Sequence, residues 1–310
     1  MNAPDAAMFE AHRKYLIGVA YRMLGTLADA EDIVQDAFLR WHRASASSVA
    51  DAQGGGTSLE NPRAYFTRIV TRLSLDRLKS AQARREMYVG PWLPEPIVGA
   101  GLERVSAQHE TELADDISYA LMLMLERLSP LERAAFLLHD VFDVDFEEIA
   151  EMLERSSDSC RQLAARARTH VRAGRARFDV NATARTRLAE AFVTATRSGD
   201  ASEVAKILTH DVVFLSDGGG RVPAAINPIH GRDHVSRLIA GLGERWLQSP
   251  DIHFEFVEIN GLPGAIFYQG QEVMQTVAIE AGENGAIAAI YTVRNPEKLA
   301  RVPKFGGDAA

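Results

Sequence analysis

The sequence predicts a multidomain fold in which two all-α regions are followed by an α+β domain. The chain has 310 residues, more than one ordinary domain, and is 46% hydrophobic and 25% charged, as is typical of globular proteins. Up to about residue 178 apolar residues recur with the period of a helix, and after residue 181 strand-like segments alternate with turns. We therefore expect four segments: 1–90, a linker at 91–111, 112–178 and 182–310.

Residues 8–43 predict two helices that separate at Gly25 and Thr26. The second helix has an apolar side and, opposite it, an acidic side, which is either a solvated surface or a docking face for a basic partner. Residues 44–61 are small, polar and glycine-rich, so we expect a flexible loop. Asn61 then caps a helix with Pro62 at its first position, and this helix is rich in arginine.

Residues 88–111 carry Pro91, Pro94 and Pro96, and this proline density excludes a helix or a central strand. Residues 112–178 predict helices again, with breaks at Ser129-Pro130 and around Asp143. Within them, 146–153 is a short helix and 157–171 a second helix, the two separated by a tight turn. The apolar stripe of the second helix consists of Cys160, Leu163, Ala164, Ala167 and Val171. This arrangement indicates a helix-turn-helix.

The last segment predicts helices at 182–198, 201–208 and near 233–245. Strands are expected at 212–216, 252–259, 264–268, 272–279 and 286–293. Helices followed by a curved antiparallel sheet indicate an α+β domain.

Composition narrows the function classes. No apolar run reaches the roughly 18 to 20 residues that a membrane span needs, and the first residues lack the apolar core of a secretory signal. A single cysteine, Cys160, allows no internal disulfide, so we expect a cytoplasmic protein, with no metal site and no cofactor. The net charge is -8, yet residues 161–187 hold eight arginines against Asp179 alone, which favours contact with an anionic partner there.

Three stretches carry a resemblance to a known family. GVAYRMLGTLADAEDIVQDAFLRWHRA (18–44) and NPRAYFTRIVTRLSLDRLKSAQARRE (61–86) resemble the core-binding and following parts of an extracytoplasmic-function (ECF) sigma factor. LSPLERAAFLLHDVFDVDFEEIAEMLERSSDSCRQLAARAR (128–168) resembles that family's helix-turn-helix, which reads the −35 promoter element. The resemblance implies a transcription initiation factor whose partners are core RNA polymerase and promoter DNA, without chemistry of its own and without catalytic residues.

The resemblance also implies which residues act. Core polymerase would contact the acidic helix face through Asp29, Asp32, Gln35, Asp36 and Leu39. The −10 element would contact Arg63, Tyr65, Arg68, Arg72 and Arg77. The −35 element would contact Ser159, Arg161, Gln162 and Arg166, although Asp158 and Ser159 occupy places where the family often has small apolar residues. Because −35 DNA stays duplex, a helix in the major groove suits it.

Three further motifs, WLPEP (92–96), DGGGR (217–221) and NPEKL (295–299), resemble marks of one ECF group that carries a cone-shaped, SnoaL-like C-terminal domain. That group usually has DGGGK and NPDKL, so Arg221 and Glu297 are departures. We expect these motifs to join the C-terminal domain to the linker and to residues 1–90, and so to control activity in cis. The residues concerned are Trp92, Leu93, Pro94, Asp217, Gly218, Gly219, Gly220, Arg221, Asn295, Pro296 and Lys298.

Two other functions stay open. SnoaL-like folds resemble ketosteroid isomerases, so the domain could be an isomerase or hydrolase, or could bind a small-molecule ligand. The candidate acid–base residues are Asp211, Asp217, His230, Asp233, His234, His253 and Tyr268, although Asp217 before three glycines is more simply a turn residue. The chain could also be a one-component, ligand-responsive regulator; a sigma factor is favoured because such a regulator needs neither the acidic helix nor 61–86.

Overall fold

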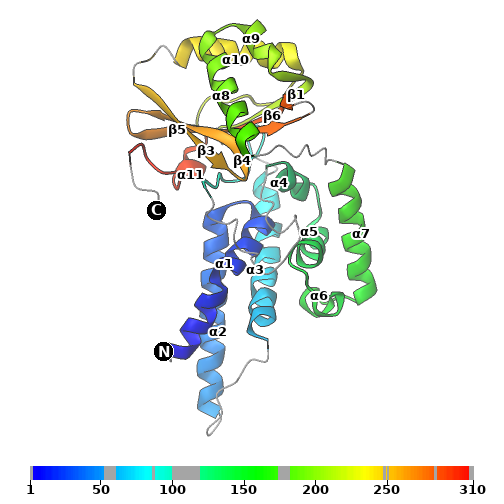
Figure 1. Cartoon of the computed structure of the whole chain (residues 1–310). Coiled ribbons are helices and arrows are strands. Elements are labelled where there is room, and N and C mark those ends of the chain that lie inside the picture. The colour runs from blue at the N-terminus through cyan, green and yellow to red at the C-terminus, as the bar shows by residue number, and fades with distance from the viewer. Residues whose placement is uncertain are drawn as a thin grey trace. The chain divides into compact units, whose positions relative to one another are not determined.

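The computed structural model describes residues 3–51, 61–85, 88–99, 119–173, 182–246, 249, 251–282 and 285–306 (Figure 1). Two compact units are present. The first contains 1–84 and 102–174, so both helical regions belong to it, and the second contains 85–101 and 175–310. The linker segment 88–99 is therefore part of the C-terminal unit. No helix among the described residues is both long enough and apolar enough to cross a membrane.

Three long helices open the first unit: α1 (Ala3–Leu24), α2 (Leu27–Asp51) and α3 (Pro62–Arg85). The predicted break between the first two is confirmed, and Gly25 occupies it with a positive φ of 78°. The cap of α3 is also confirmed, because Asn61 Oδ1 accepts a hydrogen bond from the Ala64 amide at 3.1 Å. The predicted loop is wrong over residues 44–51, which continue α2. These residues include no glycine or proline and are rich in alanine, the best helix former, so the helix propagates. Residues 52–60 lie outside the described part.

An aromatic cluster holds the three helices together. Phe9 of α1 lies at its centre, with ring centroids 4.9 Å from Phe66 of α3 and 6.1 Å from Trp41 of α2. Phe9 and Phe66 meet edge to face, a favourable aromatic geometry. This packing buries the apolar side of α2 and leaves its acidic side for other contacts.

The second helical region follows the predicted pattern. Its elements are α4 (Tyr119–Glu126), α5 (Pro130–Phe136), the π-helical turn η1 (Leu137–Val141), α6 (Phe146–Leu153) and α7 (Ser157–Ala173). Ser129 and Glu132 form a capping box before α5. Glu154 has a left-handed conformation that ends α6, and Ser156 Oγ accepts from the Ser159 amide at 3.2 Å to begin α7. The five residues of the predicted apolar stripe of α7 are all buried.

Arg133 of α5 connects the two helical regions. Its side chain is 3% exposed and pairs with Glu126 at 2.8 Å. The guanidinium donates to the carbonyl oxygens of Leu125 at 2.8 Å and Met23 at 2.6 Å, the latter in the last turn of α1. Carbonyls at a helix end lack intrahelical donors, so an arginine there satisfies a group that would otherwise be buried without a partner. Burial lowers the pKa of the Arg133 guanidinium to about 9.

The second unit is an α+β domain, as predicted. Its elements are α8 (Ala182–Ser198), α9 (Ala201–Lys206), β1 (Leu208–Asp217), β2 (Ile229–His230), α10 (Arg232–Trp246), β3 (Ile252–Ile259), β4 (Leu262–Gln269), β5 (Glu272–Ala281), β6 (Ile287–Val293) and α11 (Pro296–Leu299). The strands form one sheet in the order β2-β1-β6-β5-β4-β3, and α8, α9 and α10 lie over one of its faces (Figure 1). The core of the unit lies between these helices and the sheet.

The prediction of an antiparallel sheet needs one correction. β1 and β6 pair in parallel, while the other strand pairs are antiparallel. A parallel pair needs a long connection between its strands, and β2 to β5 with α10 supply it. β1 also begins earlier than expected, because Leu208, predicted to end a helix, is buried and pairs with Ile287.

The linker segment 88–99 lies along the edge of this sheet. Val98 forms an isolated antiparallel bridge with Ile259 of β3, the last strand in the order. The Gly99 amide donates to the Glu258 carbonyl at 2.9 Å. The linker thereby covers backbone groups that an edge strand would otherwise leave unpaired.

Candidate functional site

The acidic face of α2 is exposed, as its pattern predicts. Asp32, Gln35, Asp36 and Leu39 are exposed, and Asp29 is partly buried. Two of these carboxylates already have a partner: the Arg77 guanidinium lies 3.6 Å from Asp29 and 3.7 Å from Asp32. Two groups expected to act on different partners, one on core polymerase and one on DNA, are therefore ion-paired with each other. Asp36 lies one turn further along this exposed face.

The arginines of α3 point to several neighbours. The Arg63 guanidinium lies over the Tyr15 ring, 4.1 Å from its centroid. Arg68 pairs with Glu151 at 3.9 Å, and Arg72 pairs with Glu154 and donates from Nε to the Met152 carbonyl at 3.4 Å. Tyr65 is partly buried on the same helix, beside Phe66.

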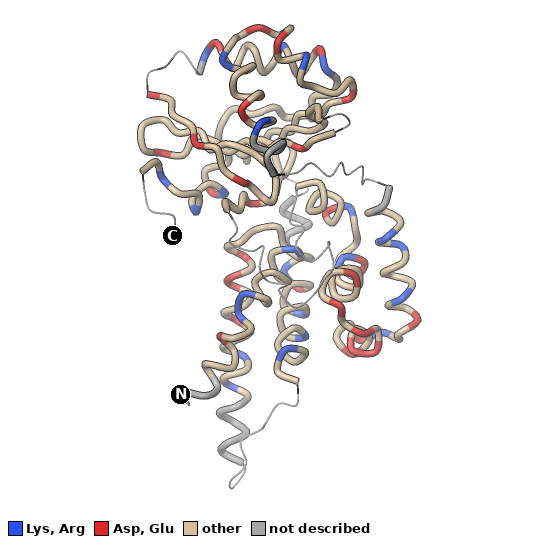
Figure 2. Tube along the Cα trace, in the orientation of Figure 1, with Lys and Arg blue, Asp and Glu red and all other residues tan. Residues whose placement is uncertain are grey.

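Arg68 and Arg72 thus face α6, the first helix of the helix-turn-helix. Acidic residues gather on α6, and basic residues lie along α3 and α7 (Figure 2). The carboxylates of Glu151 and Glu154 therefore lie next to two of the arginines that are expected to contact the −10 element. Exposed ion pairs of this kind are weak.

The residues expected to read the −35 element lie at the start of α7. Gln162 is exposed, and its side chain makes no hydrogen bond among the described residues. Arg161 is exposed but engaged: its guanidinium lies 2.9 Å from Glu147 and 3.1 Å from Asp158. Arg166 is likewise exposed and pairs with Glu132 at 2.8 Å. Ser159 contributes its amide to the cap by Ser156, which fixes the start of the helix.

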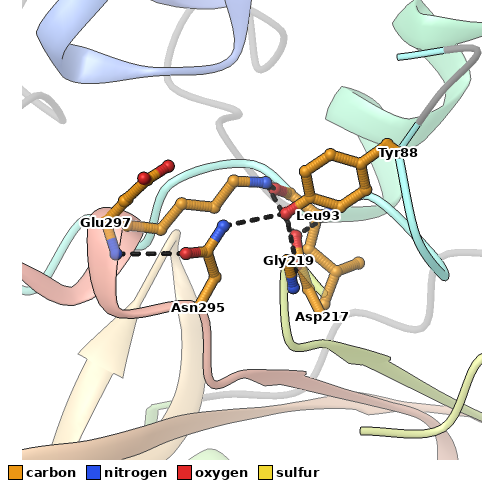
Figure 3. Close-up of polar contacts among 7 residues, drawn as sticks. Tyr88, Leu93, Asp217, Gly219, Asn295 and Glu297 are labelled. Atoms are coloured by element: carbon orange, nitrogen blue, oxygen red, sulfur yellow. Dashed lines mark hydrogen bonds and ion pairs between the residues drawn. The ribbon is translucent and has the colours of Figure 1, made fainter. Parts of the chain in front are cut away.

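The three short motifs meet in the C-terminal unit, around the carboxylate of Asp217 (Figure 3). Oδ1 accepts from the Tyr88 hydroxyl at 2.6 Å and the Gly219 amide at 3.0 Å. Oδ2 accepts from the Leu93 amide at 2.8 Å and from Lys298 Nζ at 2.7 Å. Asp217 does form the expected turn, through Gly219, but its carboxylate is fully buried and binds the linker as well. We call Tyr88, Leu93, Asp217, Asn295 and Lys298 the linker clamp.

Lys298 completes the clamp from α11. Its ammonium donates to the Leu93 carbonyl as well as to Asp217, and it lies 4.3 Å from the centroid of the Trp92 ring. Trp92 is therefore packed against a cation, an interaction that strengthens when the cation is desolvated. Pro94 is buried beside these residues.

Asn295 links the clamp to α11. Its side chain caps the helix by accepting from the Glu297 amide at 3.1 Å, with Pro296 at the first helical position. Its Nδ2 donates to the Tyr88 hydroxyl at 2.9 Å. Burial, together with the hydrogen bond to Asp217, raises the pKa of the Tyr88 phenol well above its ordinary value.

The glycines of DGGGR allow the close approach of other segments. A Cβ on Gly219 would lie 2.4 Å from Asn295 Nδ2, and φ there is 62°. A Cβ on Gly220 would lie 3.2 Å from Val89 of the linker, with φ at 69°. A Cβ on Gly218 would lie 2.4 Å from the Val222 carbonyl oxygen. A side chain at Gly219 or Gly220 would push Asn295 or the linker away, and one at Gly218 would clash within the loop itself.

Arg221 and Glu297, the two departures from the usual motifs, form an ion pair with each other (Figure 3 shows Glu297). The motif residues that vary in this chain are thus in mutual contact on the surface, while the buried members Asp217, Asn295 and Lys298 keep the usual identity.

Sequence reasoning missed Tyr88 and a second anchor at Asn260. The side-chain oxygen of Asn260 accepts a hydrogen bond from the backbone amide of Ile97 at 2.9 Å. The backbone amide of Asn260 donates to the Ile97 carbonyl at 2.9 Å. Asn260 is buried with a positive φ of 50°. The pair Asn260-Gly261 reads only as a hairpin turn, so nothing in the sequence distinguishes a turn asparagine from one that also binds the linker.

The candidate acid–base residues do not converge. The C-terminal unit has a cavity of about 440 Å³, and none of the seven candidates lines it. Asp217 belongs to the clamp, Tyr268 donates to Glu255 at 2.9 Å, and His253 stacks on Phe305 with ring centroids 5.0 Å apart. The remaining candidates, Asp211, His230, Asp233 and His234, are exposed.

Comparison with known proteins gives a consistent result. The chain matches the family models for Sigma-70 region 2 over residues 8–84 and Sigma-70 region 4 over residues 118–171. It is 38% identical over 308 residues to the ECF RNA polymerase sigma factor SigJ of Mycobacterium tuberculosis, with 96% of this chain and 94% of that protein covered. A probable ECF sigma factor SigI of the same species is 30% identical, with 96% and 95% covered. The crystal structure of the M. tuberculosis SigJ protein aligns with a TM-score of 0.72 and 36% identity, covering 95% of this chain and 98% of that one.

The chain has two helical regions, and the second contains a helix-turn-helix. A linker joins them, and an α+β domain binds this linker. This combination defines a sigma factor with a fused C-terminal domain. The chain belongs to the ECF RNA polymerase sigma factor family, whose members direct core RNA polymerase to promoters for transcription initiation. The predicted fold class is therefore confirmed, and so is the predicted function class.

Proposed function

We propose that this sigma factor is controlled in cis by the position of its linker. Residues 1–85 contact core polymerase through the acidic face of α2 and the −10 element through the arginines of α3. Residues 119–173 contact the −35 element through α7. The C-terminal domain binds neither, and instead holds the segment that joins the two DNA-binding regions. Contact between this domain and residues 1–85 remains a prediction.

The observation that carries this proposal is the linker clamp. A sigma factor must place its −10 and −35 readers at a fixed separation on DNA. The chain between α3 and α4 sets the range of separations, and here residues 88–99 are attached to the C-terminal unit at both the clamp and Asn260. Holding or releasing this segment changes the reach of the connection without altering any residue expected to contact DNA.

Run-off transcription with purified core polymerase tests the proposal. The full chain is compared with the full-length Asp217→Asn and Lys298→Met variants, whose fold is checked by circular dichroism. Variants that weaken the clamp should change transcript yield severalfold and shift the preferred spacing between the −10 and −35 elements. Unchanged yield and spacing preference, in folded variants with a released linker, would rule out control through the clamp.

We infer that the chain performs no catalysis of its own. Proton abstraction by an isomerase needs a carboxylate or imidazole facing the substrate cavity. Among the described residues, no Asp, Glu or His lines the 440 Å³ cavity. Lack of turnover of isomerase and epoxide substrates by the full chain is the expected outcome, and turnover abolished by a cavity substitution would contradict it. The partners of a sigma factor lead us to expect a cytoplasmic protein.

A further inference from the structure

The cavity of the C-terminal unit has the size and lining of a ligand site. It lies between the sheet and helices α8 and α10, and its volume of about 440 Å³ falls in the range of small-molecule pockets. Aromatic rings of Phe192, Phe214 and Phe267 form much of its wall. The exposed residues Pro223 and Arg245 also line it, so the cavity reaches the surface there.

Polar side chains cross one part of this apolar wall. Ser216 of β1 pairs in register with Thr292 of β6, which pairs in turn with Val277 of β5. Gln275 lies two residues before Val277, so its side chain is on the same face of the sheet. Ser216, Gln275 and Thr292 all line the cavity and are buried.

Gln275 places an acceptor without a partner in the wall of the cavity. It is 2% exposed, and its amide oxygen has no hydrogen-bond partner among the described residues. A buried polar atom without a partner is destabilising, and such atoms are rare in folded proteins. A hydroxyl group of a bound molecule would satisfy this acceptor.

The charge of the cavity is positive. Arg294 and Arg245 line it, and no acidic residue does so among the described residues. Arg294 follows β6, and because Thr276 pairs with Val293, Arg294 lies opposite Gln275. Its Nη1 donates to the Pro223 carbonyl, which holds the guanidinium at the wall. A carboxylate is one of the groups whose geometry a guanidinium matches with two parallel hydrogen bonds.

We propose that this cavity binds an apolar carboxylic acid with a hydroxyl group near the carboxylate, and that occupancy strengthens the hold of the clamp on the linker. The carboxylate lies at Arg294, the hydroxyl donates to Gln275, and the hydrocarbon body packs among Phe192, Phe214 and Phe267. The regulatory part of this inference rests on the proposed function.

Adjacent residues connect the cavity to the clamp. Ser216 lines the cavity and the next residue, Asp217, binds the linker; Arg294 lines the cavity and the next residue, Asn295, belongs to the clamp. The Asp217 carbonyl accepts from the amides of Arg294 at 2.7 Å and Asn295 at 3.0 Å, which ties the two strand ends together. A ligand that orders Ser216 and Arg294 therefore also orders the backbone that carries Asp217 and Asn295.

Calorimetric titration of the full chain with three probes tests the site. 3-Hydroxydecanoate has both polar groups, decanoate lacks the hydroxyl and 1-decanol lacks the charge. We expect affinity to fall about tenfold at each step, a typical effect of losing one hydrogen bond or charge contact in a buried site. In the Gln275→Leu variant, 3-hydroxydecanoate and decanoate should bind with equal affinity. In the Arg294→Met variant, decanoate and 1-decanol should bind with equal affinity.

Matched variants keep this test decisive. Arg294→Lys retains a cation and should preserve the preference for decanoate over 1-decanol. Arg237→Gln changes an exposed arginine of α10 that does not line the cavity, and should bind all probes like the natural chain. No binding of any probe at millimolar concentration, or preferences that survive both Gln275→Leu and Arg294→Met, would overturn the site.

Hydrogen exchange tests the coupling without any transcription assay. Saturating 3-hydroxydecanoate should slow exchange of the Leu93 amide, which donates to Asp217, at least threefold. The Gly99 amide, which donates to Glu258 at the other anchor, is the internal control and should change much less. Equal slowing of both amides, or of neither, overturns the coupling. Because transcription is not measured, either result is separate from the failure of cis control.

Discussion

The Nζ atom of Lys298 lies 2.7 Å from Oδ2 of Asp217, and the two side chains are 7% and 0% exposed. They are 81 residues apart in sequence, on α11 and at the end of β1, and both bind the backbone of Leu93 in the linker. Burying two charged groups is costly unless they pair with each other and all their hydrogen bonds are made. The stability of the clamp is therefore sensitive to the loss of either Asp217 or Lys298.

We predict that Asp217→Asn destabilises the chain strongly. It leaves the Lys298 ammonium buried without its counter-charge, which typically costs about 3–5 kcal/mol. Lys298→Met in the same chain removes the unpaired charge and should restore part of the loss. Urea unfolding of the two single variants and the double variant measures this coupling. Additive effects of the two substitutions would show that the pair is not coupled.

Gly219→Ala should destabilise the clamp more than a left-handed backbone alone explains. A non-glycine residue at positive φ costs about 1–2 kcal/mol, and at Gly219 the new Cβ would also lie 2.4 Å from Asn295 Nδ2. Gly270→Ala is the matched control, because its φ is 60° and nothing lies within 4 Å of its Cβ position. Thermal unfolding and protease cleavage of the linker compare the two. Equal effects at both glycines would remove the steric role assigned to Gly219.

Asp36→Arg should weaken binding to core polymerase, and the loss should shrink as salt rises, because the contact is between exposed charges. Asp36 is a better test position than Asp32, which pairs with Arg77 within the chain. Asp211→Arg is an exposed charge reversal in the C-terminal unit and should leave core binding unchanged. Affinity measured at two salt concentrations checks this. A folded Asp36→Arg variant with unaltered core affinity would contradict a docking role for this face.

Asp158→Asn should increase affinity of the polymerase–sigma complex for −35 duplex DNA, by about two- to fivefold at low salt. The substitution removes a negative charge at the expected phosphate-binding surface and one of the two carboxylates that pair with Arg161, so that only Glu147 remains. Arg161→Ala should instead lower the affinity for −35 duplex DNA. If Arg161 contacts a base, the loss should be roughly 1–3 kcal/mol, with relaxed sequence specificity at that position. If Arg161 contacts a phosphate, the affinity for all sequences should fall alike. Fluorescence anisotropy with promoter and scrambled duplexes separates these outcomes. Unaltered affinity in both variants would return Arg161 to an ordinary surface role.

Glu151→Gln with Glu154→Gln should improve binding of the core-bound chain to a single-stranded −10 oligonucleotide. The two carboxylates pair with Arg68 and Arg72, and removing them frees both arginines for phosphates. Stability should change by less than about 1 kcal/mol, because these glutamates are largely exposed. Glu148 lies on the same helix and has no ion pair among the described residues, so Glu148→Gln serves as the control. A gain in oligonucleotide affinity as large for Glu148→Gln would show a general charge effect instead.

Local structure was predictable where one strong signal acts within a few residues. Asn61-Pro62 marks the start of α3, the apolar stripe from Cys160 to Val171 identifies the buried side of α7, and Ser129 begins α5. The end of α2 was missed, because serine and alanine residues are compatible with both loop and helix. The parallel pairing of β1 with β6 was also missed, since strand patterns report burial and not direction.

The sequence by itself determined the order of the regions, the family and the three motifs WLPEP, DGGGR and NPEKL, because each depends on residues close together in the chain. Only the tertiary structure decided that Asp217 is a buried ion-pair partner as well as a turn residue, that Asn260 binds the linker and Tyr88 of the linker binds Asp217, and that Arg72 faces Glu154. These contacts join residues 80 or more positions apart. Whether a polar group is buried and paired depends on which distant segments pack against it. The periodicity of one segment shows only which of its faces is apolar.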